Sequence, residues 1–339
     1  MTIPSSISVI IPTYGRCVQV QRALEALARQ TLAPDRYEVI VSIDGSVDGT
    51  REMVAHFPAP YTLRAIWQPN RGRAAACNAG IRLATGEVLV ILDDDMTPRP
   101  GLLVAHQQAH AGGSRRGVVG AVPIPIDPSS PPAAQYYGQK FNCHLEKLAQ
   151  PGYHMGVKDF VSNNFSIRRD LLLEVGLFDE DFKIYGHEDS ELALRLLRAG
   201  VQLVYSPEAV AEQAYTKDVA ALARDHIAKG RTAVLFAIKH PSVIPDLRLG
   251  QYRRDSWKRR CLRIALLGLS RLWARMPEHV ILVMMWVGRR RPARLPLYYA
   301  LALDYFYWLG VQAALRENRA AGRKPASLAE LVGLGASQA

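Results

Sequence analysis

The sequence has few cysteines, a deficit of acidic residues and no long hydrophobic run. Its four cysteines, Cys17, Cys77, Cys143 and Cys261, lie far apart and form no CxxC pair. This spacing argues against a zinc site or a disulfide framework and favours reduced thiols in a cytoplasmic setting. The N-terminal stretch MTIPSSISVIIPTYGR lacks the basic region and long apolar core of a signal peptide. With 49% hydrophobic residues, the chain is nevertheless expected to be globular.

The deficit of acids leaves a strong positive charge. Lysine and arginine total 42 against 31 acidic residues, which gives a net charge of +11 and predicts an acidic partner such as a nucleotide or an anionic lipid. The excess is concentrated between residues 253 and 294. No nucleic-acid motif is present, so nucleic acid is not predicted as a partner.

The C-terminal part of the chain also contains short apolar stretches, two within the basic region at 262–272 and 277–288 and one after it at 295–311. None reaches the ~20 uninterrupted apolar residues of a spanning helix. Apolar stretches bordered by arginine and aromatic residues favour helices lying on an anionic membrane surface. The alternative is a buried helical subdomain whose arginines are solvated. We predict peripheral association with the inner face of the membrane.

The first hundred residues alternate between apolar runs and helical patterns. Strands are expected at 7–12, 37–43, 62–67 and 88–92, with the first and the last of them buried, and helices at 18–30, 48–57 and 73–84. This order predicts a mostly parallel α/β sheet flanked by helices, with ligands beyond the carboxyl ends of the strands. Three polar clusters fall at that edge: Pro12-Thr13-Tyr14, Asp44-Gly45-Ser46 and Asp93-Asp94-Asp95.

The three aspartates end the strand at 88–92 and lose hydration there. Alternation along an extended segment predicts that Asp93 and Asp95 point one way and Asp94 the other. Two carboxylates on one side suit Mg²⁺ or Mn²⁺ carrying substrate phosphates. A solvated turn before a helix starting near Thr97-Pro98 explains the triplet equally well when it is taken alone.

The second half of the sheet region is less regular. Residues 112–152 include the proline-rich VPIPIDPSSPP and are expected to form strands and loops that contribute to an acceptor groove. Asn163 and Asn164 precede a short strand, and Glu188 and Asp189 open a helix. A helix N-terminus stabilises an acidic residue by about 0.3–1 kcal/mol, which explains their position without explaining the preceding Tyr185-Gly186-His187 loop.

Six segments stand in an order that resembles the family 2 glycosyltransferases: SVIIPTYGR, SIDGSVDGT, PNRGRAAACNAG, GEVLVILDDDMTP, SNNFSIRRDLLLEVGLFDE and GHEDSELALRLLRAG. The resemblance implies an inverting enzyme of the GT-A fold that uses nucleotide sugars. It covers residues 1–230, with a nucleotide-binding half at 1–100 and an acceptor-binding half at 101–230. A helical, membrane-associated region at 231–319 and a flexible or weakly helical tail at 320–339 are expected to follow.

The resemblance also implies site residues. Asp93 and Asp95 correspond to the DxD element that holds Mn²⁺ or Mg²⁺, with Asp95 favoured as the direct ligand. Asp189 corresponds to the general base, and Glu188 is its neighbour in the acceptor site. Asp44 is implied to contact the uracil or ribose, and Pro12 and Tyr14 to line the base pocket. The full donor site predicted is Pro12, Thr13, Tyr14, Arg16, Asp44, Gly45, Arg71, Arg73, Asn78, Asp93 and Asp94; the predicted acceptor residues are Asn163, Asn164 and His187.

Three positions depart from the family pattern. Ile43 replaces an acid before Asp44, Cys77 replaces an arginine, and Gln213 falls where many relatives have a histidine near the metal. Arg71 or Arg73 is then expected to supply the missing cation. Loop variation is the simpler explanation for Gln213; otherwise metal binding depends more on Asp95 and the substrate.

The predicted reaction moves a sugar, with a UDP-sugar favoured, to a hydroxyl of a glycan, lipid-linked glycan or small-molecule acceptor. No motif for a protein nucleophile is present, as expected for direct displacement. A nucleotidyltransferase would carry a glycine-rich, lysine-containing loop near the N-terminus, which PTYGRCVQVQR is not. A non-catalytic, membrane-associated scaffold protein would be favoured by loss of Asp95 or Asp189, and both are present.

Overall fold

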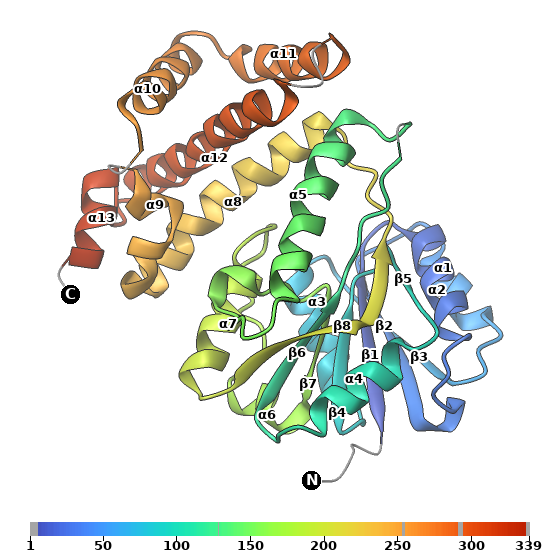
Figure 1. Cartoon of the computed structure of the whole chain (residues 1–339). Helices are drawn as coiled ribbons and strands as arrows, with labels where there is room; N and C mark the ends of the chain where they lie inside the picture. Colours follow the sequence, from blue (N-terminus) through green and yellow to red (C-terminus); the bar gives the residue numbers. More distant parts are fainter. Residues whose placement is uncertain (1–5, 128, 253–254, 291–293, 337–339) are drawn as a thin grey trace. The chain divides into compact units, whose positions relative to one another are not determined.

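The computed structural model describes residues 6–127, 129–252, 255–290 and 294–336, so Arg253, Arg254 and Arg291 of the basic region lie outside it. The chain forms two compact units (Figure 1). Unit 1 comprises Met1–Ile126, Gly138–Lys183 and Glu188–Tyr215, and unit 2 comprises Asp127–Tyr137, Ile184–His187 and Thr216–Ala339.

Unit 1 is built on an eight-stranded mixed sheet in the order β3-β2-β1-β4-β7-β6-β8-β5. β1 pairs in parallel with β2 and β4, whereas β7 is antiparallel to both β4 and β6. The strands are β1 (Ile7–Thr13), β2 (Tyr37–Asp44), β3 (Thr62–Gln68), β4 (Val88–Leu92), β5 (Met96–Pro98), β6 (Arg116–Ala121), β7 (Asn164–Arg168) and β8 (Gln202–Gln213). The four strands predicted from apolar runs are all present.

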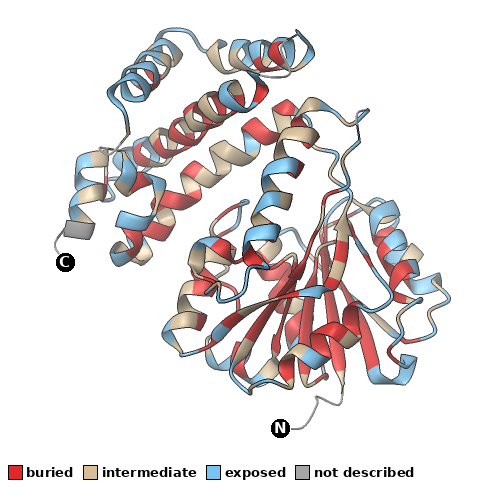
Figure 2. Cartoon of the chain, in the orientation of Figure 1, coloured by how far each residue is buried: buried red, intermediate tan, exposed pale blue. Residues whose placement is uncertain are grey.

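Helices cover both faces of this sheet. In β1, Val9 packs with α1 (Cys17–Leu27) and α4 (Leu102–His110), while its neighbour Ile10 packs with α3 (Arg73–Leu83) and α7 (Glu188–Arg198). Unit 1 also contains α2 (Thr50–His56), α6 (Arg169–Glu174) and the larger part of a further helix described below. Burial on both faces explains why β1 and β4 are mostly apolar, whereas β3, at the edge of the sheet, is partly exposed (Figure 2).

The expectation of strands and loops through residues 112–152 is partly wrong. β6 lies there, but the segment also forms α5 (Pro132–Leu148), a helix of 17 residues. The proline-rich stretch ends at Pro132, which is the first residue of α5. Proline is favoured at that position because the first helical N–H has no intrahelical partner. The prolines therefore mark a helix start.

Unit 2 is helical. Its elements after residue 216 are α8 (Val219–Lys239), α9 (Arg248–Gln251), α10 (Trp257–Leu272), α11 (Met276–Arg290), α12 (Leu295–Ala320) and α13 (Leu328–Ala336). α8 and α12 pack with their backbones in close approach, since a Cβ on Gly310 would stand 2.0 Å from the carbonyl oxygen of Ile227. α13 makes the tail helical, and its Leu331 is fully buried.

The two helices that follow α9 differ in burial from α12. Figure 2 shows α12 largely buried and α10 and α11 largely exposed. Within the described residues, no helix is both long enough and apolar enough to cross a membrane.

Candidate functional site

The aspartate triplet forms a turn at the carboxyl end of β4. The strand ends at Leu92, and the backbone N–H of Met96 donates to the carbonyl oxygen of Asp93 at 3.2 Å. The predicted alternation is wrong because the segment is not extended. Asp94 and Asp95 both approach Arg16, at 2.8 and 3.4 Å, whereas Asp93 turns toward α3.

Arg73, the first residue of α3, connects Asp93 with Asp189. Its Nη2 and Nε lie 2.7 and 3.1 Å from Asp93 Oδ1, and its Nη1 lies 3.4 Å from Asp189 Oδ1. Ser162, before β7, donates to the same Asp189 oxygen and also accepts from Arg73 Nη1 at 3.0 Å. One guanidinium thereby joins three segments that are far apart in the sequence.

The surroundings of Cys77 show which of the two expected arginines lies near the aspartates. Cys77 lies one helical turn after Arg73 and is fully buried, and burial raises the pKa of its thiol to about 12. Arg71 is 61% exposed and pairs with Glu180 at 2.8 Å. Of the two expected cations, Arg73 is the one that reaches the aspartates.

Asp94 holds the loop after β1. Its Oδ2 accepts from Thr13 Oγ1 at 2.7 Å and its Oδ1 accepts from Arg16 Nη1 at 2.8 Å. Burial raises the pKa of Asp94 to about 6, against the opposing effects of Arg16 and Thr13. The carboxylate is therefore engaged in fixing Arg16 at the rim of the site.

Asp95 lies at the junction of β4 and the last residue of β8. Gln213 Nε2 is 3.3 Å from Asp95 Oδ2, so the residue that replaces the expected histidine still reaches the aspartate. The Asp95 side chain is 16% exposed, so it is accessible from the site. No group of three His, Cys, Asp or Glu side chains is arranged to hold a metal among the residues that the structure describes. A cation here would complete its coordination with substrate oxygens and water, as Mg²⁺ does when it binds phosphates.

Asp44, at the end of β2, organises the loop that leads into α3. Its Oδ1 accepts from Arg71 N at 2.9 Å and from Gln68 Nε2 at 2.7 Å, and its Oδ2 accepts from Gly72 N at 2.8 Å. The next residue, Gly45, has φ +84° and could not carry a Cβ, which would stand 2.7 Å from Asn70 N. Asp44 thus shapes this loop, and its predicted contact with the nucleotide stays a prediction.

Three of the residues predicted as ligands are buried. Asn78 Nδ2 donates to the carbonyl oxygen of Phe178 at 2.9 Å, and Asn78 Oδ1 accepts from Phe178 N at 3.0 Å. Asn164 is fully buried, with its Oδ1 2.9 Å from His106 Nε2 and its Nδ2 2.8 Å from the carbonyl oxygen of Ala209. Pro12 is buried in β1. These contacts give the three residues a structural role, and their predicted contacts with donor or acceptor stay predictions.

The remaining predicted residues differ in accessibility. Tyr14 is 59% exposed next to the buried Thr13, as a stacking residue requires. Asn163 is half-buried, and its carbonyl oxygen accepts from Asp93 N at 3.0 Å. Glu188 begins α7 and is 4% exposed.

His187 belongs to unit 2, where it packs on α8. Its Nδ1 is 3.0 Å from Thr232 Oγ1, and its ring contacts Phe236. Burial, with Lys229 nearby, lowers the pKa of His187 to about 3, so the ring is neutral at pH 7. Its predicted contact with an acceptor stays a prediction.

Sequence reasoning missed Ser162, which orients Asp189. The residue stands at the start of SNNFSIRRD, but serine is common in loops and nothing local marks it. Its role depends on Arg73 and Asp189, which are 89 and 27 residues away.

Comparison with known proteins shows which proteins this chain is similar to. The model of glycosyl transferase family 2 matches residues 8–176, and a model described as the N-terminal domain of galactosyltransferase matches residues 143–217. Validoxylamine A glucosyltransferase of Streptomyces hygroscopicus subsp. limoneus is 32% identical over 269 residues, which cover 71% of this chain and 58% of that protein. The chain thus spans about three-fifths of this relative's length.

Two solved structures share the fold. The mannosyltransferase PcManGT from Pyrobaculum calidifontis, in complex with GDP-Man and Mn²⁺, has a TM-score of 0.52 at 22% identity and covers 100% of this chain and 81% of that one. S. aureus TarS 1–349, in complex with UDP-GlcNAc, has a TM-score of 0.53 at 14% identity and covers 94% of this chain and 92% of that one. At these identities the likeness shows a common GT-A fold.

Proposed function

This chain belongs to glycosyltransferase family 2, and we propose that it moves a sugar from a nucleotide-sugar donor to a hydroxyl group with inversion of the anomeric carbon. The observation that carries the proposal is the Arg73 bridge. It holds Asp93, beside the expected diphosphate position, and Asp189, the expected base, on one guanidinium.

In the proposed step, Asp189 accepts the proton of the acceptor hydroxyl while that oxygen attacks the anomeric carbon. The bond from that carbon to the diphosphate oxygen breaks, and the nucleoside diphosphate leaves with the electron pair. Ser162 and Arg73 fix Asp189 Oδ1 by hydrogen bonds, which supports this role because a general base must be positioned against its proton. A single displacement needs no protein nucleophile.

A divalent cation fits the hard oxygen donors of the aspartate turn. Asp95 would hold it, with Asp93 nearby, and Mn²⁺ or Mg²⁺ would neutralise charge on the leaving diphosphate. Arg73 and Arg16 lie beside these carboxylates and supply further positive charge. Thr13 and Tyr14 are proposed to flank the base, for which a UDP-sugar is favoured. The proposed acceptor is a glycan, a lipid-linked glycan or a small molecule.

A thermal-shift panel of nucleoside diphosphates and nucleotide sugars, with and without Mn²⁺, tests the donor site. A ligand at about 100 times its Kd stabilises the fold by roughly 2.7 kcal/mol. Asp95→Ala should remove the metal-dependent part of the shift, whereas Asp189→Asn should keep the shift and abolish transfer. Absence of any nucleotide shift would refute the donor site, and full turnover by Asp189→Asn would refute the base.

We also propose that unit 2 binds an anionic membrane surface, on the cytoplasmic side. Eleven large hydrophobic side chains between residues 257 and 297 are exposed, including Leu272 at 87% and Trp286 at 52%. Exposed arginines, among them Arg271 and Arg289, lie on the same helices. Apolar side chains beside cationic ones match the acyl boundary and headgroups of an anionic bilayer.

Sedimentation with phosphatidylglycerol vesicles tests this surface. Leu272→Glu combined with Trp286→Glu should abolish binding, because each puts a charge at the acyl boundary. Val47→Glu, at a position in unit 1 that is 96% exposed, is the matched control and should bind as the wild type does. Equal binding of all three proteins would refute a membrane surface on α10 and α11.

A further inference from the structure

Unit 2 contains a buried arginine whose hydrogen-bonding capacity is only partly used. Arg263 on α10 is 3% exposed. Its Nε donates to Asp304 Oδ2 at 2.9 Å, and its Nη2 donates to Asp255. Within the described part of the chain, no acceptor stands within hydrogen-bonding distance of its Nη1.

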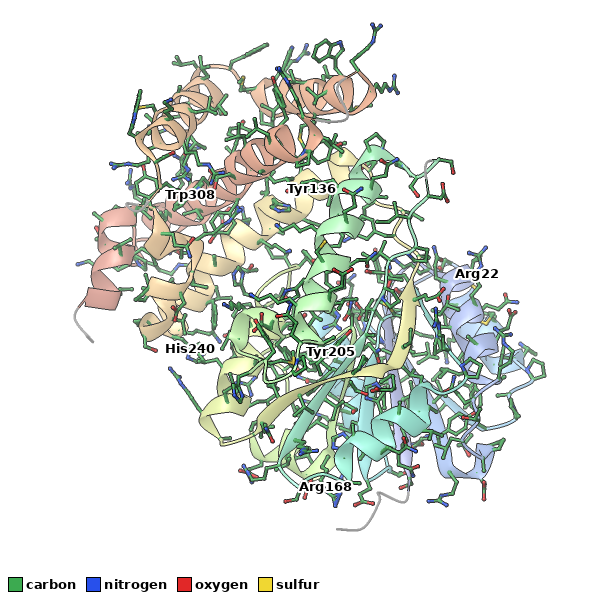
Figure 3. All side chains as sticks on the ribbon, in the orientation of Figure 1. Arg22, Tyr136, Arg168, Tyr205, His240 and Trp308 are labelled. Carbon is green, nitrogen blue, oxygen red and sulfur yellow. The ribbon has the colours of Figure 1, made fainter. Side chains whose placement is uncertain are left out.

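Aromatic rings hold this guanidinium in place. Its central carbon lies 4.8 Å from the ring centre of Trp308 on α12 (Figure 3) and 5.2 Å from that of Tyr252. With the rings and the two aspartates fixing its plane, the group cannot rotate to find another acceptor. The guanidinium is therefore held in a constant orientation, with Nη1 buried and without a partner among the described residues.

Arg263 lines a cavity of about 50 Å³ between α9, α10 and α12. One ordered water needs roughly 10–15 Å³ of such space, so the cavity has room for a larger polar group. Arg248 and Arg259 line the same cavity, together with Asp304. Arg248 Nη1 is 3.7 Å from Asp304 Oδ1, so Asp304 lies between two arginines.

The charges at this place do not balance. Three arginines, at positions 248, 259 and 263, face two carboxylates, Asp255 and Asp304. The excess positive charge at this cavity favours an anionic ligand. We propose that this cavity binds a phosphate group, supplied either by a phospholipid headgroup or by a free phosphate.

Phosphate is favoured over a carboxylate by the number and spread of donors. A phosphate presents three or more acceptor oxygens around one centre, so it can accept from Arg248 and Arg259 at once. α10 also carries exposed apolar side chains such as Ile264 and Leu272. A lipid headgroup in the cavity would thus belong to the same helix that presents apolar residues to a bilayer.

The test is a direct binding measurement on the full chain, by calorimetry with inorganic phosphate and with short-chain phosphatidic acid. The test variant is Arg248→Gln with Arg259→Gln. It removes two of the three arginines that line the cavity and leaves the buried Arg263 in place. The matched control is Arg22→Gln with Arg29→Gln, which removes the same charge at exposed positions outside the cavity. Saturating UDP with Mn²⁺ occupies the donor site in every titration.

The wild type and the control should bind phosphate with the same affinity, and the test variant at least tenfold more weakly. At least tenfold tighter binding of phosphatidic acid than of phosphate, lost in the test variant, would assign the group to a lipid headgroup; equal affinities would assign it to free phosphate. Equal weakening in both variants, equal binding of acetate, or no binding by the wild type would overturn the proposal. Because no turnover is measured, these outcomes are independent of the proposed transferase activity.

Discussion

Replacing Arg73 by lysine should damage catalysis far more than it damages the fold. Lysine keeps the positive charge but loses the fork that now contacts Asp93 at 2.7 and 3.1 Å and Asp189 at 3.4 Å. Each charge-assisted bond contributes about 1.5–3 kcal/mol when buried. Because the Arg73 side chain is 24% exposed, we discount the combined loss to about 2 kcal/mol. That loss corresponds to roughly a 30-fold fall in kcat.

The assay is initial-rate transfer from the donor found in the thermal-shift panel, with melting temperatures recorded for every variant. Arg71→Lys is the control, since Arg71 lies two residues earlier, is 61% exposed and pairs with Glu180; its kcat should stay within about twofold. In Arg73→Ala, added guanidinium ion should partly restore the rate. Wild-type kcat in Arg73→Lys, or an equal loss in Arg71→Lys, would refute the bridging role.

Other predictions concern stability. Gly310→Ala should destabilise unit 2 by about 1–3 kcal/mol, because its Cβ would stand 2.0 Å from the α8 backbone. Gly268→Ala, with nothing within 4 Å of its Cβ, should stabilise α10 by up to about 1 kcal/mol. Chemical denaturation measures the free energy of unfolding of both variants. Burial lowers the pKa of His110 to about 3, so below pH 6.5 the folded state binds fewer protons than the unfolded state. The free energy of unfolding therefore decreases as pH falls through this range. In His110→Gln, the melting temperature should decrease less on the acid side. For Asp94 the pH dependence is opposite, because burial raises its pKa to about 6. Between pH 4 and 6 the folded state binds more protons at this carboxyl than the unfolded state does. The stability of the wild type relative to Asp94→Asn should therefore fall as pH rises through that window. A pH-independent difference between either variant and the wild type would contradict these assignments.

The sequence by itself determined the sheet half of the molecule. A strand that is buried on both faces is mostly apolar. The unbroken apolar run at residues 88–92 therefore predicted a strand with the same bounds as β4 in the structure. The order of strand and helix then placed the aspartate turn, Asp44 and Thr13 at one edge, because parallel strands end on the same side. Asp189 at the start of α7 followed from the helical pattern after it.

Only the tertiary structure decided what each polar side chain does. Arg73, and not Arg71, contacts Asp189, which is 116 residues away in the sequence, and the partner of Asn78 lies in a loop 100 residues away. Asn164 is polar in a loop-like sequence, yet three hydrogen bonds hold it in the core. Local patterns fix which segments are buried, because burial repeats with the period of the helix or strand. Hydrogen-bond partners are chosen by the packing of distant segments, and no short stretch of sequence records that choice.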